Sequence, residues 1–313
     1  MHIRLVEIYW ILGSLLAAVS LASAIGYAFD RRRPDDPAIR NLNLRIRSWW
    51  VMILLGGGAL LAGRLAMILL FAFISFLTLR EFVTQVPVRR ADHSAVFICF
   101  FLALPVQYVL IGIAWYGLFS IWIPVYCFLA LAIAAALFSD TERFLDRAAA
   151  VHWALMLCVY CLSHIPALLT LRIAGYENRE PLLVVFVVLV AQVSDILQYV
   201  WGKLIGRRLV APALSPSKTV EGLAGGVLSA TVFGALLWSI TPFTPWQAGL
   251  MALAIAILGF LGGLVMSAIK RSRGIKDWSQ LIEGHGGMLD RVDSLCFSAP
   301  VFFHLTRYFF SQT

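Results

Sequence analysis

The stretch from Leu182 to Trp201 reads LLVVFVVLVAQVSDILQYVW and is apolar over almost its whole length. A helix needs about 20 such residues to cross a bilayer, because each residue adds about 1.5 Å against a hydrocarbon core roughly 30 Å thick. The stretch therefore predicts a membrane span. It also contains Asp195, and an ionisable residue inside a span is costly and is by default a candidate for function.

Composition extends this prediction to the whole chain. The 313 residues are 61% hydrophobic and 13% charged, whereas a soluble domain carries about 25% charged residues. We expect an all-α polytopic bundle of about nine or ten transmembrane helices. The candidate spans are residues 7–29, 49–63, 65–83, 95–115, 118–138, 150–171, 182–201, 220–240, 246–268 and 294–310.

Basic residues predict how the bundle is oriented. Most of the 25 Lys and Arg residues fall in alternate loops, and those in the other loops or at the N-terminus are Arg4, Arg64, Arg172, Arg179 and Arg307. Cytoplasmic loops carry the excess of Lys and Arg. We therefore expect a multi-pass protein of the inner (plasma) membrane, with the basic loops in the cytoplasm.

Two further predictions concern organisation. One continuous membrane domain is expected, with residues 1–180 as an N-terminal multi-span region and residues 181–313 as the region carrying the catalytic loops. Residues 39–50 place apolar and basic side chains on different faces, which favours an amphipathic helix lying in the membrane interface.

The net charge of +8 suits binding to acidic lipids or phosphorylated ligands. The chain has no long basic tract outside the spans, so nucleic acid is not an expected partner.

The last basic loop and its flanks read SAIKRSRGIKDWSQLIEGHGGMLDRVD from Ser267 to Asp293. Asp290 and Asp293 share one face of a helix and can hold a divalent cation, for which hard oxygen ligands favour Mg²⁺. Glycines let backbone N–H groups approach phosphate, and basic side chains neutralise it. The residues with these roles are Lys270, Arg271, Lys276, Arg291, Gly286 and Gly287, with His285 beside them. A plain basic loop that only sets topology is the alternative interpretation.

The preceding loop, GKLIGRRLVAPALSPSKTVEG from Gly202 to Gly222, offers hydroxyls and a cation to an anion. The candidates there are Ser215, Ser217, Lys218 and Thr219. Asp195 and Tyr199 lie about one turn apart on one helix face just before this loop. A cytoplasmic linker and an interhelical hydrogen bond are the plainer interpretations of these two features.

These two blocks together resemble the phosphatidate cytidylyltransferase (CDP-diacylglycerol synthase) family. The matching motifs are Ser267, Lys270-Arg271, Lys276-Asp277, His285-Gly286-Gly287, Asp290-Arg291 and Asp293, preceded by Asp195, Tyr199, Gly202, Gly206 and Ser215 to Gly222. The resemblance covers about the last 120 residues. Gly263 stands where the family has Asp, and Glu283 stands where it has Pro or Gly, which suggests a divergent member.

The resemblance implies transfer of CMP from CTP to phosphatidic acid, releasing pyrophosphate. It implies Mg²⁺ held by Asp290 and Asp293 with Asp195, and catalytic roles for Asp277, His285, Lys270, Arg271, Lys276 and Arg291. Substrate binding would fall to Ser215, Ser217, Lys218, Thr219, Ser267, Gly286, Gly287 and Tyr199. A homodimer is left open. The competing hypotheses are a CTP-dependent lipid kinase, which would release CDP, and a transporter or non-catalytic relative.

Overall fold

The computed structural model describes residues 2–33, 36–86, 92–138, 142–284 and 286–312 of the chain. It is a bundle of long helices, as the composition predicts. The uninterrupted helices are α1 (His2–Arg32), α2 (Pro37–Ala62), α3 (Arg64–Gln85), α10 (Glu180–Ile205), α11 (Val220–Leu236), α12 (Pro245–Ser272) and α13 (Leu289–Phe310). The other spans are composite: α4 (His93–Ile98) with α5 (Leu104–Gly112), α6 (Tyr116–Ile121) with α7 (Phe128–Phe138), and α8 (Phe144–Leu155) with α9 (Leu162–Ala167).

Each composite span contains a wide π turn between its two α-helical parts. The turns cover Cys99–Ala103, Trp122–Cys127 and Met156–Cys161. A proline lies within or shortly after each of them: Pro105, Pro124 and Pro166. Proline lacks the N–H that would close an α-helical turn, so a local π arrangement can restore the ladder around it. These spans therefore stay continuous despite their prolines.

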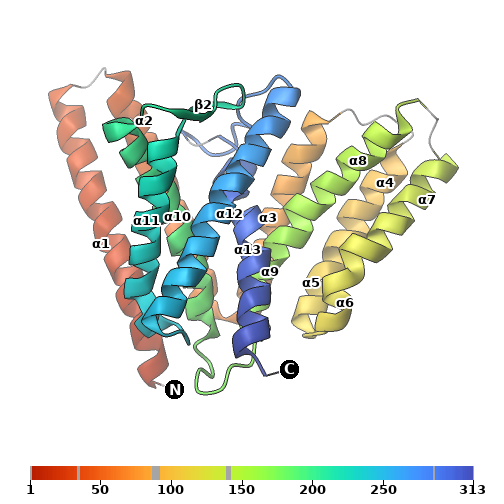
Figure 1. Ribbon diagram of the computed structural model, residues 1–313, viewed down its shortest axis with the longest axis horizontal. Coiled ribbons are helices and arrows are strands. Elements are labelled where there is room, and N and C mark those ends of the chain that lie inside the picture. Colours follow the sequence, from red (N-terminus) through yellow and green to blue (C-terminus); the bar gives the residue numbers. More distant parts are fainter. Residues whose placement is uncertain (1, 34–35, 87–91, 139–141, 285, 313) are drawn as a thin grey trace.

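Nine of the helical segments that the structure describes are long and apolar enough to cross a membrane. The remaining long helix, α13, has 22 residues but begins with charged Asp290, Arg291 and Asp293. Figure 1 shows successive spans running up and down, so that both chain ends lie at one end of the bundle. Helices α1, α3, α7, α10 and α12 therefore all end at the opposite end of the bundle. The polytopic all-α prediction is confirmed.

One prediction about the second span was wrong. Residues 39–50 do not form a separate interfacial helix, because they are the first half of the continuous helix α2. Asp36 caps this helix by accepting a 2.8 Å hydrogen bond from the Ala38 N–H, and Pro37 opens it. Ile46 is buried, and the Ser48 hydroxyl donates to the Glu283 carbonyl at 2.9 Å. The inward face of this half is therefore used for packing against the chain.

A short antiparallel ribbon interrupts the helical pattern between α10 and α11. Strand β1 (Leu209–Ala211) pairs with β2 (Ser215–Thr219), with Leu209 opposite Thr219 and Ala211 opposite Ser215. The ribbon lies across the end of the bundle at which α1, α10 and α12 end (Figure 1). It turns the chain back so that β2 runs directly into α11.

Small residues let the last four helices approach closely. A Cβ on Gly234 of α11 would lie 2.2 Å from the Ala252 Cβ of α12, and one on Gly259 would lie 3.3 Å from the Ser294 Cβ of α13. Close backbone approach through glycine is a common way to pack helices in lipid, where no hydrophobic force drives them together. The packing fixes how α12 and α13 face each other near Gly263 and Asp293.

Candidate functional site

The candidate site centres on Lys218 of β2. Its Nζ lies only 2.7 Å from where a Cβ on Gly263 would stand, and 4.8 Å from the ring centroid of Phe260. One carboxylate oxygen of Asp293 lies 4.0 Å from the same Cβ position. Burial lowers the pKa of Lys218, while the nearby negative charges of Asp293 and Asp195 oppose that effect. The ribbon thus brings the two chemical blocks of the sequence together.

Two carboxylates, Asp195 on α10 and Asp293 on α13, form what we call the carboxylate pair. Asp293 is half-buried and accepts a 2.8 Å hydrogen bond from the Ser294 N–H, while Asp195 is exposed. The charges of Asp293, Lys218 and Arg291 all act on Asp195. The Nε of Arg291 is buried without a hydrogen-bond partner in the described part of the chain. Two acids and two bases therefore share one small region.

Asp290, predicted to be a metal ligand, instead accepts hydrogen bonds from the loop between α12 and α13 and from Lys270. Its carboxylate accepts hydrogen bonds from Lys270 Nζ at 2.7 Å, from the Trp278 N–H at 2.9 Å and from the Gly287 N–H at 3.0 Å. The side chains of Asp290 and Lys270 are only 6% and 15% exposed. The acidic residue therefore fixes the loop between α12 and α13, and its oxygens are already engaged by protein donors.

The described residues contain no group of three His, Cys, Asp or Glu close enough together to hold a metal ion. The three aspartates predicted to share Mg²⁺ are thus not gathered as one ligand set. The carboxylate pair alone still fits this cation, because Mg²⁺ is typically bound through one or two carboxylates together with substrate phosphates and water. The chemistry of the donors fits a metal that is completed by a nucleotide.

Glu81 was missed by the sequence analysis. It lies in α3, is 6% exposed, and its carboxylate accepts from the Ser279 hydroxyl at 2.6 Å. It also accepts from the N–H groups of Met288 and Leu289 at 2.9 and 2.8 Å, at the start of α13. An acid at a helix N-terminus satisfies otherwise unpaired N–H groups. The available signal was an acidic residue inside an apolar predicted span.

The loop between α12 and α13 is also tied to α2. Arg45 Nε donates to the Gly284 carbonyl at 3.2 Å, next to the Ser48 contact with Glu283. Ile282 and Gly286 exchange backbone hydrogen bonds of 2.8 and 3.1 Å, which close a tight turn with Gly284 and Gly286 at positive φ. His285, a predicted catalytic residue, lies outside the described residues.

Thr219, predicted to bind substrate, caps α11 instead. Its side-chain oxygen accepts a 3.1 Å hydrogen bond from the Gly222 N–H. Gly202 and Gly206 are required nearby, since a Cβ on either would lie 3.2 or 2.6 Å from that oxygen. The glycines of this motif therefore allow the cap to pack against the end of α10.

The other predicted residues divide by exposure. Lys276, Asp277 and Ser217 are exposed, and their side chains make no hydrogen bond or ion pair within the described chain. They remain accessible to a ligand. Ser215 is buried in β2, and Gly287 faces Glu81.

Two more of the predicted residues make hydrogen bonds to backbone carbonyls. Ser267 donates to the Gly263 carbonyl at 2.7 Å, and Arg271 donates to the carbonyls of Leu214 and Ile275 at 3.4 Å. Tyr199 is 66% exposed and lies beside Lys203.

Comparison with known proteins identifies the family. The model of the cytidylyltransferase family matches residues 43–309, which is most of the chain and includes every residue of the candidate site. The chain belongs to the cytidylyltransferase family. It is therefore a membrane-bound nucleotidyltransferase, whose described residues include nine helices long and apolar enough to cross a membrane.

Relatives in this family differ in how much of the chain they match. An uncharacterized protein of Escherichia coli strain K12, YnbB, is 40% identical over 298 residues, covering 95% of this chain and 97% of that protein. The phosphatidate cytidylyltransferases of Staphylococcus saprophyticus and Aquifex aeolicus are 35% and 42% identical over 130 and 112 residues. Those two matches span half or less of the relatives' own length, 50% and 42%.

Proposed function

We propose that this cytidylyltransferase transfers CMP from CTP to phosphatidic acid, giving CDP-diacylglycerol and pyrophosphate for phospholipid synthesis. The observation that carries the proposal is the meeting of Lys218, Asp293 and Asp195 from three separate segments. A lysine beside two carboxylates suits a nucleoside triphosphate, because a metal ion and a cationic side chain together neutralise its negative charge. The partial matches to phosphatidate cytidylyltransferases support phosphatidic acid as the acceptor.

The role proposed for each residue of the site follows from its position relative to the carboxylate pair. The carboxylate pair would hold Mg²⁺, which when bound neutralises and orients the triphosphate. Lys218 and Arg291 would contact phosphate oxygens, since both lie beside the pair. Lys276 and Asp277 are exposed at the loop surface and would complete the binding of the nucleotide or of the lipid headgroup. Asp290 and Glu81 would act by holding the loop, without touching substrate.

The chemical step needs little from an acid or base. A phosphate oxygen of phosphatidic acid, already anionic, attacks the α-phosphorus of CTP. The bond from that phosphorus to the bridging oxygen of the β-phosphate breaks, and pyrophosphate leaves with its electrons. Catalysis then depends on bringing two anions together and on neutralising their charge, which Lys218 and Arg291 are placed to do.

We further propose that the site faces the cytoplasm, where CTP is available. Helices α1, α3, α7, α10 and α12 end at the same end of the bundle as the site (Figure 1), and the excess of Lys and Arg that follows them in the sequence supports a cytoplasmic location for that end. Residues 181–313 would carry the chemistry. Residues 1–180 would support it through Glu81, Arg45 and Ser48, whose contacts reach the loop before α13.

The test uses purified protein in detergent with phosphatidic acid, Mg²⁺ and CTP labelled in either the cytidine or the γ-phosphate. Transfer of cytidine label into the organic phase, with pyrophosphate released, is the expected result. Transfer of γ-phosphate label into lipid, with CDP released, would instead identify a lipid kinase. Neither label in lipid, from protein that still binds CTP, would reject phosphatidic acid as the acceptor.

A further inference from the structure

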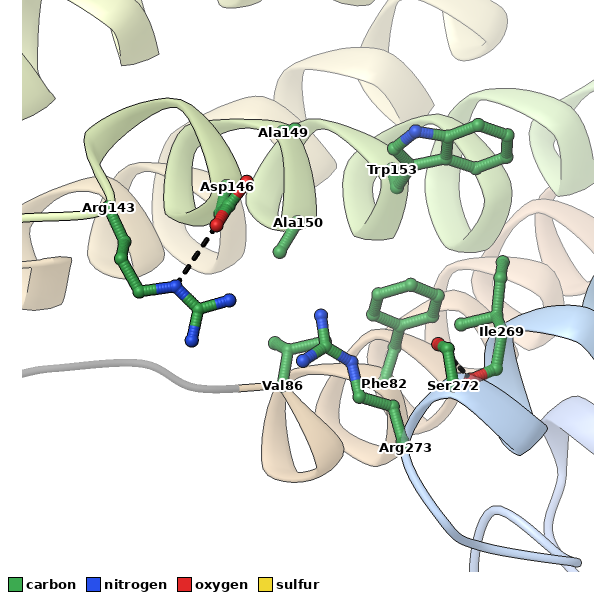
Figure 2. A pocket seen from close by; sticks show the side chains of 10 residues that line it. All are labelled: Phe82, Val86, Arg143, Asp146, Ala149, Ala150, Trp153, Ile269, Ser272 and Arg273. Atoms are coloured by element: carbon green, nitrogen blue, oxygen red, sulfur yellow. Dashed lines mark hydrogen bonds and ion pairs between the residues drawn. The ribbon is translucent and has the colours of Figure 1, made fainter.

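A second feature lies at the same end of the bundle, away from the carboxylate pair. It is a cavity of about 370 Å³ between the end of α3, the start of α8 and the end of α12. Figure 2 shows Arg143 and Arg273 turned toward each other across it, with Phe82 beside Arg273 and Trp153 farther along α8. This volume falls in the range of sites for small molecules.

The cavity carries a net positive charge. Arg143 Nε pairs with Asp146 at 3.0 Å, but both side chains are more than half exposed, so this pair contributes little stability. Arg273 is exposed and has no ion-pair partner among the residues that the structure describes. Two guanidinium groups facing one space are typical of phosphate recognition, because each can donate two parallel hydrogen bonds.

Apart from Ser272, the rest of the lining is apolar. Phe82, Val86, Ile269 and the half-exposed Trp153 form this wall. Trp153 lies nine residues inside the span Phe144–Thr170, so its exposed ring offers apolar surface deeper in the bundle than Arg143. A cationic rim above an apolar wall matches a phospholipid, whose phosphate and upper acyl chain need these two surfaces in this order.

One residue of the cavity wall, Phe82, packs against the loop between α12 and α13. The Phe82 ring stacks on Trp278, with centroids 4.9 Å apart and planes at 22°. Trp278 is fully buried, and its backbone N–H donates to Asp290. Phe82 also follows Glu81, which holds the start of α13. An occupant of the cavity would therefore press on the residues that fix this loop, without reaching the carboxylate pair.

We propose that this cavity is an accessory site for an anionic phospholipid, distinct from the acceptor of the reaction. The lipid phosphate lies between Arg143 and Arg273, and its upper chain lies along Trp153 and Phe82. Binding stabilises the Phe82–Trp278 stack and hence the loop before α13.

The test measures lipid binding directly and does not depend on turnover. Native mass spectrometry of the purified protein in detergent follows binding of phosphatidylglycerol, with phosphatidylcholine and inorganic phosphate as comparison ligands. The test variant is R143Q/R273Q. The control is R32Q/R33Q, which removes the same charge from exposed arginines elsewhere at the same end of the bundle.

We expect phosphatidylglycerol to bind R143Q/R273Q about tenfold more weakly than wild type, with R32Q/R33Q unchanged. D146N should bind it more tightly, because the carboxylate that competes for Arg143 is gone, and this variant tests the site even if R143Q/R273Q folds poorly. Equal binding by the two double variants, or no gain in D146N, would overturn the proposal. Inorganic phosphate bound as tightly as the lipid would also overturn it, by showing a simple anion site.

Discussion

Glu81 accepts a 2.8 Å hydrogen bond from the N–H of Leu289, across a separation of 208 residues. The contact joins the third span to the first residue of α13, four residues before Asp293. A buried carboxylate that accepts three hydrogen bonds is held firmly and holds its donors in turn. The first half of the chain therefore fixes the position of the helix that carries the proposed metal ligand.

Replacing Glu81 with Gln should reduce turnover by about tenfold or more while the protein still folds. The amide removes the charge and turns one acceptor into a donor, and hydrogen bonds to a charged group contribute about 1.5–3 kcal/mol. The measurements are CMP transfer and limited proteolysis of the loop at residues 273–284, which should be cut faster. E7Q is the matched control, since Glu7 pairs with Arg179, away from this loop. Equal activity and proteolysis in the two variants would contradict the role of Glu81.

Gly287→Ala should have a similar effect by a steric route. A Cβ at Gly287 would lie 2.7 Å from a Glu81 carboxylate oxygen and about as close to the other one, so the contact must open. We expect turnover to fall about tenfold. Gly58→Ala in α2 is the control, because no atom lies within 4 Å of its Cβ position. If both variants kept full activity, the close packing of Gly287 on Glu81 would not matter to catalysis.

Asp290→Asn should mainly lower stability, whereas Asp293→Asn should mainly lower turnover. Asp290 pairs with the largely buried Lys270, so its replacement should lower the free energy of unfolding by about 3 kcal/mol. Asp293 accepts one hydrogen bond from the residues that the structure describes, so its replacement should leave the melting temperature nearly unchanged. Its turnover should nevertheless fall by about two orders of magnitude or more, because a proposed metal ligand is lost. Thermal unfolding and CMP transfer are measured on both; full turnover in D293N would reject the metal assignment.

Gly263→Asp should lower the Mg²⁺ concentration that gives half-maximal activity. The new carboxylate would lie beside Lys218 and Asp293, and the flexible Lys218 side chain can move to make room for it. A third carboxylate near the pair strengthens cation binding. Gly263→Asn has nearly the same size without the charge and is the control. The same Mg²⁺ dependence in both variants would mean that position 263 does not face the metal.

Removing divalent cations should abolish turnover reversibly. The described residues offer two carboxylates, Asp195 and Asp293, to the proposed site, so the metal would be held mainly together with substrate phosphates and would be easily lost to a chelator. The measurement is CMP transfer after treatment with EDTA and again after adding Mg²⁺. Activity that persists in excess chelator would exclude the proposed role of the carboxylate pair.

The sequence was sufficient for the architecture because each span satisfies its own backbone hydrogen bonds within one apolar segment. Hydropathy therefore locates α1 to α13 without knowledge of their neighbours, and the distribution of Lys and Arg indicates which loops share a side. It failed at residues 39–50, where an amphipathic pattern fits both an interfacial helix and the first half of a span. Only the burial of Ile46 and the contact of Ser48 with Glu283 distinguish the two.

The sequence predicted which residues belong to the candidate site, but the fold decided which partners each of them contacts. Spacing alone could not separate Asp290 from Asp293, since both lie on the same face of one helix. The first faces Lys270 and two backbone N–H groups, and the second faces Lys218 and Asp195. Which partner a side chain meets depends on helix packing through Gly234 and Gly259 and on the turn of the β1–β2 ribbon. These are contacts between distant segments, so the local pattern fixed the spans and only the tertiary structure decided which partners Glu81, Lys218 and the two aspartates meet.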